Sequence, residues 1–246
     1  MIPIRNTVPS RYPATVTWML IATNCVVFMF QITLSPMELL EFLYRFALIP
    51  ARYFSAFGGG RAEIALDDFL PFITMMFLHG GWVHLILNMW MLWLFGPTIE
   101  DRFGHGRYLA FYLACGVLAA LAHALFNPTS TVPALGASGA IAGVLGCYMR
   151  LFPLARVIVL VPILFLPLFF EVPAMVFVGF WFVTQVLSGT IDLLMPSGAG
   201  GVAWWAHIGG FLAGFAFGSL LTQPERRYRI YYPDEGVLGF TPTGRR

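Results

Sequence analysis

The sequence predicts an all-α integral membrane protein in which six helices cross the bilayer as a bundle. Apolar residues make up 59% of the 246 residues and charged residues only 11%, against about 45–50% and about 25% in soluble globular domains. The apolar residues gather in uncharged runs long enough to supply the ~20 helical residues that span a bilayer core. The net charge of +2 comes with scattered arginines and no lysine, so the composition does not favour nucleic-acid binding.

Six apolar runs are candidate membrane spans. They are Ala14–Leu34, Pro71–Pro97, Tyr108–Phe126, Ala134–Phe152, Val172–Ile191 and Val202–Leu221. The first run lacks a small-residue cleavage pattern, so we expect a retained helix rather than a signal peptide. One more apolar segment, Val157–Phe170, is short for a span and contains Pro162 and Pro167. An interfacial or re-entrant segment is therefore expected there.

The arginines predict an orientation. With six spans, eleven of the fourteen arginines fall on the side that holds both chain ends, and the positive-inside rule places that side in the cytoplasm. The long segment 35–70 between the first two spans then forms a partly helical loop at the outer membrane surface. We expect a short cytoplasmic N-terminus (1–13), a membrane domain (14–222) and a cytoplasmic C-terminal tail (223–246).

Polar side chains lie near the outer ends of three of these spans. His84 and Asn88 occur near the start of the second span, Ser138 near the start of the fourth and His207 near the start of the sixth. These spans run in the same direction, so a rise of about 1.5 Å per residue places the side chains within roughly 10 Å of the outer boundary. A serine, a histidine and an amide donor can attack a carbonyl, accept a proton and hold an oxyanion. No acidic residue lies at this depth, which favours a Ser-His dyad.

Each of these residues also has a simpler explanation when it is taken alone. A serine between glycines in a membrane helix is more often a packing residue, and Gly139 and Gly143 support that use. An intramembrane histidine can bridge helices or relay protons, and Asn88 can hold two helices together. A transporter or channel is a further alternative, but no inverted repeat is visible. The sequence has no His-Glu-x-x-His motif and no intramembrane aspartate pair, so neither a metal nor another cofactor is expected.

Three motifs on these spans resemble the rhomboid family of intramembrane serine proteases. The Gly-x-Ser-Gly motif appears as Gly136–Gly139, the His-x-x-x-Asn motif as His84–Asn88, and the Ala-His-x-x-Gly motif as Ala206–Gly210. The resemblance covers about residues 14–221, with the motifs in order on the corresponding spans. It implies a rhomboid-like bundle of six helices that hydrolyses peptide bonds in or near transmembrane segments of other proteins.

The resemblance also implies a role for each motif residue. Ser138 would be the nucleophile and His207 the general base, and the oxyanion hole would comprise His84, Asn88 and the backbone N–H of Ser138. Gly136, Gly139, Gly210 and His79 would support the structure, with His79 orienting the loop or the substrate. Some family members carry an aromatic residue four positions after the serine, where this chain has Ala142.

Partners and location follow from the same interpretation. The expected partners are transmembrane protein substrates and the lipid bilayer, with no nucleic acid, and the oligomeric state is left open. We expect a multi-pass protein of the bacterial cytoplasmic membrane whose active site opens to the outer side. The alternative is a catalytically inactive rhomboid-like protein that binds membrane proteins. We hypothesise that the fifth span moves to admit substrate, together with the glycine-rich loop 197–201. This span is bulky and contains Phe180 and Trp181.

Overall fold

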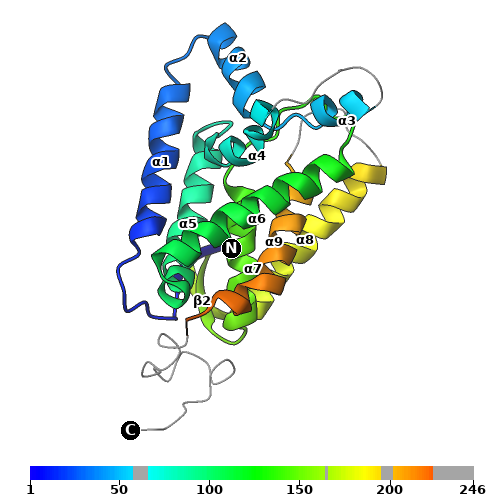
Figure 1. Cartoon of the computed structure of the whole chain (residues 1–246). Helices are drawn as coiled ribbons and strands as arrows, with labels where there is room; N and C mark the ends of the chain where they lie inside the picture. The colour runs from blue at the N-terminus through cyan, green and yellow to red at the C-terminus, as the bar shows by residue number, and fades with distance from the viewer. Residues whose placement is uncertain (58–65, 164–165, 195–201, 224–246) are drawn as a thin grey trace.

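The computed structural model describes residues 1–57, 66–163, 166–194 and 202–223. In this part of the chain, each predicted span overlaps one long helix of a bundle, although α5, α6 and α8 extend beyond the predicted bounds (Figure 1). These helices are α1 (Thr15–Gln31), α5 (Trp82–Phe103), α6 (His105–Phe126), α7 (Ser138–Leu151), α8 (Ala174–Leu194) and α9 (Trp204–Phe217). Four described helices are long and apolar enough to cross a membrane: α5, α6, α8, and α9 with its 3₁₀ extension η3 (Gly218–Leu221). Helices α1 and α7 are shorter, with 17 and 14 residues.

Helix α7 is the central helix of the bundle, and α8 is a peripheral one. Eleven of the 14 residues of α7 are buried, because α5, α6, α8 and α9 all pack on it. Helix α8 buries only Ala174, Val178, Gln185 and Gly189 among its 21 residues. The closest packing joins α7 to α9, where a Cβ atom at Gly210 would overlap the carbonyl oxygen of Gly139. Small residues allow such close approach between membrane helices.

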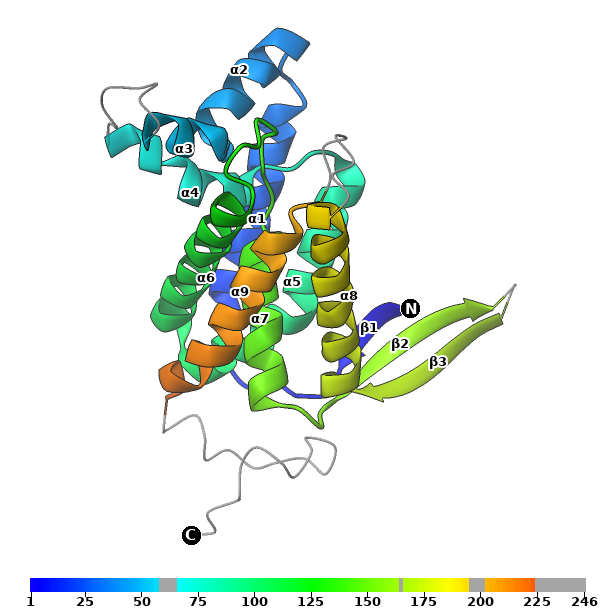
Figure 2. The same ribbon diagram turned by 90° about the vertical axis from the view of Figure 1, so that its right-hand side faces the viewer.

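Short helices lie on one side of the end of the bundle from which α5, α7 and α9 start (Figures 1 and 2). They are α2 (Pro36–Phe46), α3 (Ala51–Phe57), η1 (Leu66–Phe69), α4 (Pro71–Thr74) and η2 (Met75–Phe77). Leu48 pairs with Ala134 in an isolated antiparallel bridge, and the Ala51 N–H donates to the Ser130 carbonyl at 3.0 Å. The segment between the first two spans therefore anchors the loop that leads into α7.

The opposite end carries a small antiparallel sheet, which the sequence did not predict (Figure 2). Strands β1 (Ile2–Asn6), β2 (Arg156–Ile163) and β3 (Leu166–Pro173) pair in that order. The all-α prediction is therefore wrong for these residues, and the interfacial or re-entrant segment is a β-hairpin. Its prolines disfavour a helix, while its β-branched and aromatic residues suit strands that satisfy each other's backbone groups.

Two carboxylates at the end of α5 hold the start of α1. Glu100 accepts hydrogen bonds from the N–H groups of Val16 and Thr17, both at 2.8 Å, and from the Thr17 hydroxyl at 2.7 Å. Asp101 accepts from the N–H groups of Arg11 and Tyr12, both at 2.8 Å. The first N–H groups of a helix have no partner within it, so Glu100 satisfies groups of α1 that burial would otherwise penalise. Asp101 holds the segment that precedes this helix. Of the predicted tail 223–246, the residues from 224 onward lie outside the described residues.

Candidate active site

Ser138 and His207 form a hydrogen-bonded pair at the start of two adjacent helices. Ser138 is the first residue of α7, and His207 lies in the first turn of α9. The Ser138 Oγ and His207 Nε2 atoms are 2.8 Å apart, which is within hydrogen-bonding distance. The close contact of Gly139 with Gly210 fixes the spacing of α7 and α9 next to this pair. Two residues far apart in sequence are thus held in the geometry of a nucleophile and its base.

The second nitrogen of His207 is bonded to a residue that the sequence interpretation missed. Gln185 on α8 places its Oε1 atom 2.7 Å from His207 Nδ1, and its side chain is only 5% exposed. A glutamine within an apolar membrane helix needs a polar partner, and this is the signal that could have identified it. Trp181 and Trp204 lie against the imidazole, with ring centroids 5.8 and 6.3 Å from it. Ala142 is not aromatic and cannot stack on the imidazole, but these two indoles provide aromatic contacts to it. Trp181, which the sequence interpretation named only as a bulky residue of a mobile span, therefore also packs against His207.

His84 lies next to the turn that precedes Ser138. A Cβ atom at Gly136 would lie 2.8 Å from the Cε1 and Nε2 atoms of His84, and 3.6 Å from Ser138 Oγ. Gly136 also has φ +125°, a conformation that favours glycine. The His84 Nδ1 atom accepts from the Gly80 N–H at 3.4 Å. The neutral ring then carries its proton on Nε2, the nitrogen that faces Gly136.

Asn88 lies one helical turn further along α5 than His84. Its side chain is 6% exposed, and its Nδ2 has no hydrogen-bond partner among the described residues. A buried amide donor without a partner costs about 1–3 kcal/mol. No described residue therefore competes for this donor.

His79 connects α1 to the segment before α5. Its backbone N–H donates to Gln31 Oε1 at 3.0 Å, and its carbonyl accepts from Gln31 Nε2 at 3.2 Å. Its ring meets the His84 ring edge to face, with centroids 5.1 Å apart. The His79 ring thus contacts the His84 ring, and Gln31 fixes the position of the His79 backbone.

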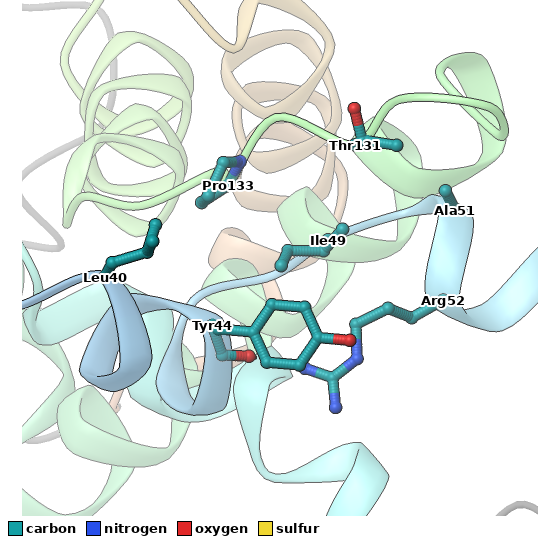
Figure 3. A pocket seen from close by; sticks show the side chains of 7 residues that line it. All are labelled: Leu40, Tyr44, Ile49, Ala51, Arg52, Thr131 and Pro133. Atoms are coloured by element: carbon teal, nitrogen blue, oxygen red, sulfur yellow. The ribbon is translucent and has the colours of Figure 1, made fainter. Parts of the chain in front are cut away.

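A pocket of about 350 Å³ lies near α2 and α3, and its lining residues include neither Ser138 nor His207. Figure 3 shows this pocket from close by. It lies between α2, the start of α3 with the segment before it, and the loop that precedes α7. The residues that line it are Leu40, Tyr44, Ile49, Ala51, Arg52, Thr131 and Pro133. The Arg52 guanidinium stacks on the Tyr44 ring at 4.6 Å and pairs with Asp68 at 3.7 Å. Across the described ranges, no group of three or more His, Cys, Asp or Glu side chains could hold a metal ion.

Comparison with known proteins gives consistent matches. The Rhomboid domain family matches residues 67–224. Rhomboid protease GluP of Bacillus subtilis is 40% identical over 86 residues, which cover 35% of this chain and 16% of GluP. The mitochondrial Rhomboid protein 1 of Saccharomyces cerevisiae is 28% identical over 166 residues, covering 65% of this chain and 44% of the yeast protein. The mitochondrial RHOMBOID-like protein 6 of Arabidopsis thaliana is 32% identical over 157 residues, covering 62% and 44%. The chain spans less than half the length of each of these relatives.

Proposed function

Because this chain belongs to the rhomboid family of helical, multi-pass membrane proteins, we propose that it is an intramembrane serine endopeptidase with Ser138 and His207 as its catalytic dyad. The observation that carries the proposal is the 2.8 Å distance between Ser138 Oγ and His207 Nε2. A serine hydroxyl at that distance can pass its proton to the imidazole as it attacks a carbonyl carbon.

The proposed reaction has two halves. In the first, Ser138 Oγ attacks the carbonyl carbon of the scissile peptide bond while His207 Nε2 takes the hydroxyl proton. The tetrahedral intermediate collapses, His207 gives that proton to the leaving amine, and the remaining fragment stays on Ser138 as an ester. In the second half, His207 takes a proton from water, the hydroxide attacks the ester carbon, and the proton returns to Ser138 Oγ. The products are a free amine and a carboxylic acid.

The developing oxyanion requires donors close to Ser138. We assign this role to the Ser138 backbone N–H, the Nε2–H of His84 and the Nδ2 amide of Asn88. Support comes from the His84 ring against Gly136 and from the buried Asn88 donor. The first N–H groups of α7 have no carbonyl partner within the helix, and the helix dipole favours negative charge at this position.

We further propose six membrane spans with both chain ends in the cytoplasm. Arg102 and Arg150 lie in the last turns of α5 and α7, and Arg156 begins β2, at the end of the bundle that carries the sheet. Arg45 and Arg52 belong to α2 and α3, which lie at the opposite end. The positive-inside rule then directs Ser138 to the outer side. The substrates would be transmembrane proteins, which enter from the bilayer past α8. The relatives come from a bacterium and from mitochondria, and location in the bacterial cytoplasmic membrane stays a prediction.

Cleavage by the purified full-length chain in proteoliposomes tests the proposal. A reporter protein with one transmembrane segment should be cut by the wild type and left intact by Ser138→Ala and His207→Ala. A fluorophosphonate probe should label the wild type at Ser138 and fail on Ser138→Ala, while both variants keep the wild-type unfolding temperature. A wild type that binds the reporter but neither cuts it nor reacts with the probe would instead be an inactive rhomboid-like binding protein.

A further inference from the structure

The imidazole of His207 contacts two other helices through its two nitrogens. Nε2 faces Ser138 on α7 and Nδ1 faces Gln185 on α8. A neutral imidazole carries its proton on either nitrogen, and only the tautomer with the proton on Nδ1 leaves a lone pair on Nε2 for the serine proton. With no acid in a dyad, another group must select this tautomer.

The hydrogen bonds of the Gln185 amide show which end faces His207. Its Nε2 atom donates to Thr184 Oγ1 at 3.1 Å and to the Trp181 carbonyl at 3.3 Å. The Thr184 hydroxyl donates its own hydrogen to the Trp181 carbonyl at 2.6 Å, so its oxygen remains an acceptor for the amide. Since the nitrogen end is bound in this way, the oxygen end lies at 2.7 Å from His207 Nδ1. An amide oxygen only accepts hydrogen bonds, so Nδ1 must carry the proton.

We propose that Gln185 is a positioning residue that selects the reactive tautomer of His207 and holds its ring toward Ser138. The inference rests on the proposed function of that pair. The direction of the amide is decisive, because an amide turned the other way would donate to Nδ1 and place the proton on Nε2. In serine proteases with a triad, an amide in place of the acid has that effect and lowers kcat about 10⁴-fold. Here Thr184 and the Trp181 carbonyl prevent that reversal by occupying the amide nitrogen.

Burial makes the contact difficult to replace. His207 is 8% exposed and Gln185 5% exposed, and the indoles of Trp181 and Trp204 lie against the imidazole. Without Gln185, the Nδ1 proton would lose its acceptor in an apolar environment, and both tautomers would be populated. Gln185→Met keeps the shape of the side chain but removes the acceptor, and kcat should fall about 10- to 100-fold with little change in KM. Gln185→Glu keeps an acceptor oxygen and should restore most of the lost rate.

The experiment compares these variants of the full-length protein in proteoliposomes. The measurements are kcat and KM for the reporter, the rate of fluorophosphonate labelling, the unfolding temperature, and the ¹⁵N spectrum of His207. Thr190→Val is the matched control, because Thr190 is an exposed residue of the same helix whose hydroxyl bonds to the Val186 carbonyl. The expected result is a slower reaction and slower labelling only in Gln185→Met, near-wild-type rates in Gln185→Glu, and unchanged rates in Thr190→Val.

The spectrum separates this inference from the proposed function. In the wild type, Nδ1 should be protonated and Nε2 unprotonated, and Gln185→Met should show a mixture. A wild type with its proton on Nε2 would overturn the inference, as would equal kcat in Gln185→Met and wild type, or equal losses in the Met and Glu variants. If the wild type neither cuts the reporter nor reacts with the probe, the proposed function fails, while the spectrum still decides which tautomer Gln185 selects.

Discussion

Replacing Gly210 with alanine tests whether the contact between α7 and α9 sets the distance between Ser138 and His207. A Cβ atom at Gly210 would overlap the carbonyl oxygen of Gly139 and lie 2.9 Å from its carbonyl carbon. Carbon atoms in contact stay about 3.5–4.0 Å apart. The backbone of Gly139 cannot yield as a flexible side chain would, so the two helices must separate by about 1 Å.

This separation acts directly on the dyad. The 2.8 Å distance between Ser138 Oγ and His207 Nε2 would lengthen to about 3.8 Å, which is outside hydrogen-bonding range. A misplacement of about 1 Å can lower a rate about 100-fold. Overpacking costs about 1–3 kcal/mol, and the better helix propensity of alanine offsets up to about 1 kcal/mol. The variant should therefore stay folded but cleave about 100 times more slowly.

The assay is reporter cleavage in proteoliposomes, with fluorophosphonate labelling and thermal unfolding measured in parallel. Gly106→Ala is the control, because Gly106 is an exposed residue of α6 with no heavy atom within 4 Å of the added Cβ. Its rate should match the wild type and its unfolding temperature should not fall. A folded Gly210→Ala variant that cleaves within threefold of the wild-type rate would show that the reasoning about this contact is wrong.

Three other perturbations give separate predictions. Asn88→Ala should lower kcat about 10²- to 10³-fold in the reporter assay by removing one oxyanion donor, and an unchanged kcat would assign Asn88 to helix packing. Phe180 is 62% exposed, so Phe180→Ala should preserve or raise the rate of cleavage. Trp181→Ala should lower that rate, because it removes an aromatic ring that packs against the His207 imidazole. Equal effects of the two substitutions would contradict this difference. Glu100→Ala should lower the free energy of unfolding by roughly 2–5 kcal/mol, since it leaves buried donors at the start of α1 without an acceptor, and thermal unfolding that matches the wild type would refute that capping role.

The sequence identified Ser138 and His207, the two residues of the proposed dyad, because the evidence for each of them is local. Ser138 and His207 sit in short motifs, and the constant rise of a helix converts sequence position into depth. Each of the six predicted apolar runs overlaps a long helix for the same reason, since spans are recognised by the length and composition of one segment.

Features that depend on partners distant in sequence were missed. The predicted role of Gln185 requires the rotation of α8 about its axis, and no motif or run of apolar residues specifies that rotation. Glu100 belongs to a cluster of charges in the sequence, yet its partners include the N–H groups of α1, 83 and 84 residues away. The hairpin at β2 and β3 is a short apolar run, for which helix and strand are difficult to distinguish. Its β2 strand also pairs with β1 at the other end of the chain.

The shortness of α7 connects the proposed reaction to the lipids around the protein. Its 14 residues extend about 21 Å at 1.5 Å per residue, whereas the hydrocarbon core of a bilayer is about 30 Å thick. The 22 residues of α5 and of α6 reach about 33 Å. If Leu151 lies at the inner boundary, Ser138 lies about 9 Å below the outer one, unless the bilayer thins locally at a cost of fractions of a kcal/mol per Å. Longer acyl chains would place Ser138 deeper and lengthen the path that water must take to the ester. The host membrane would thereby influence the rate of hydrolysis through the length of its fatty acids.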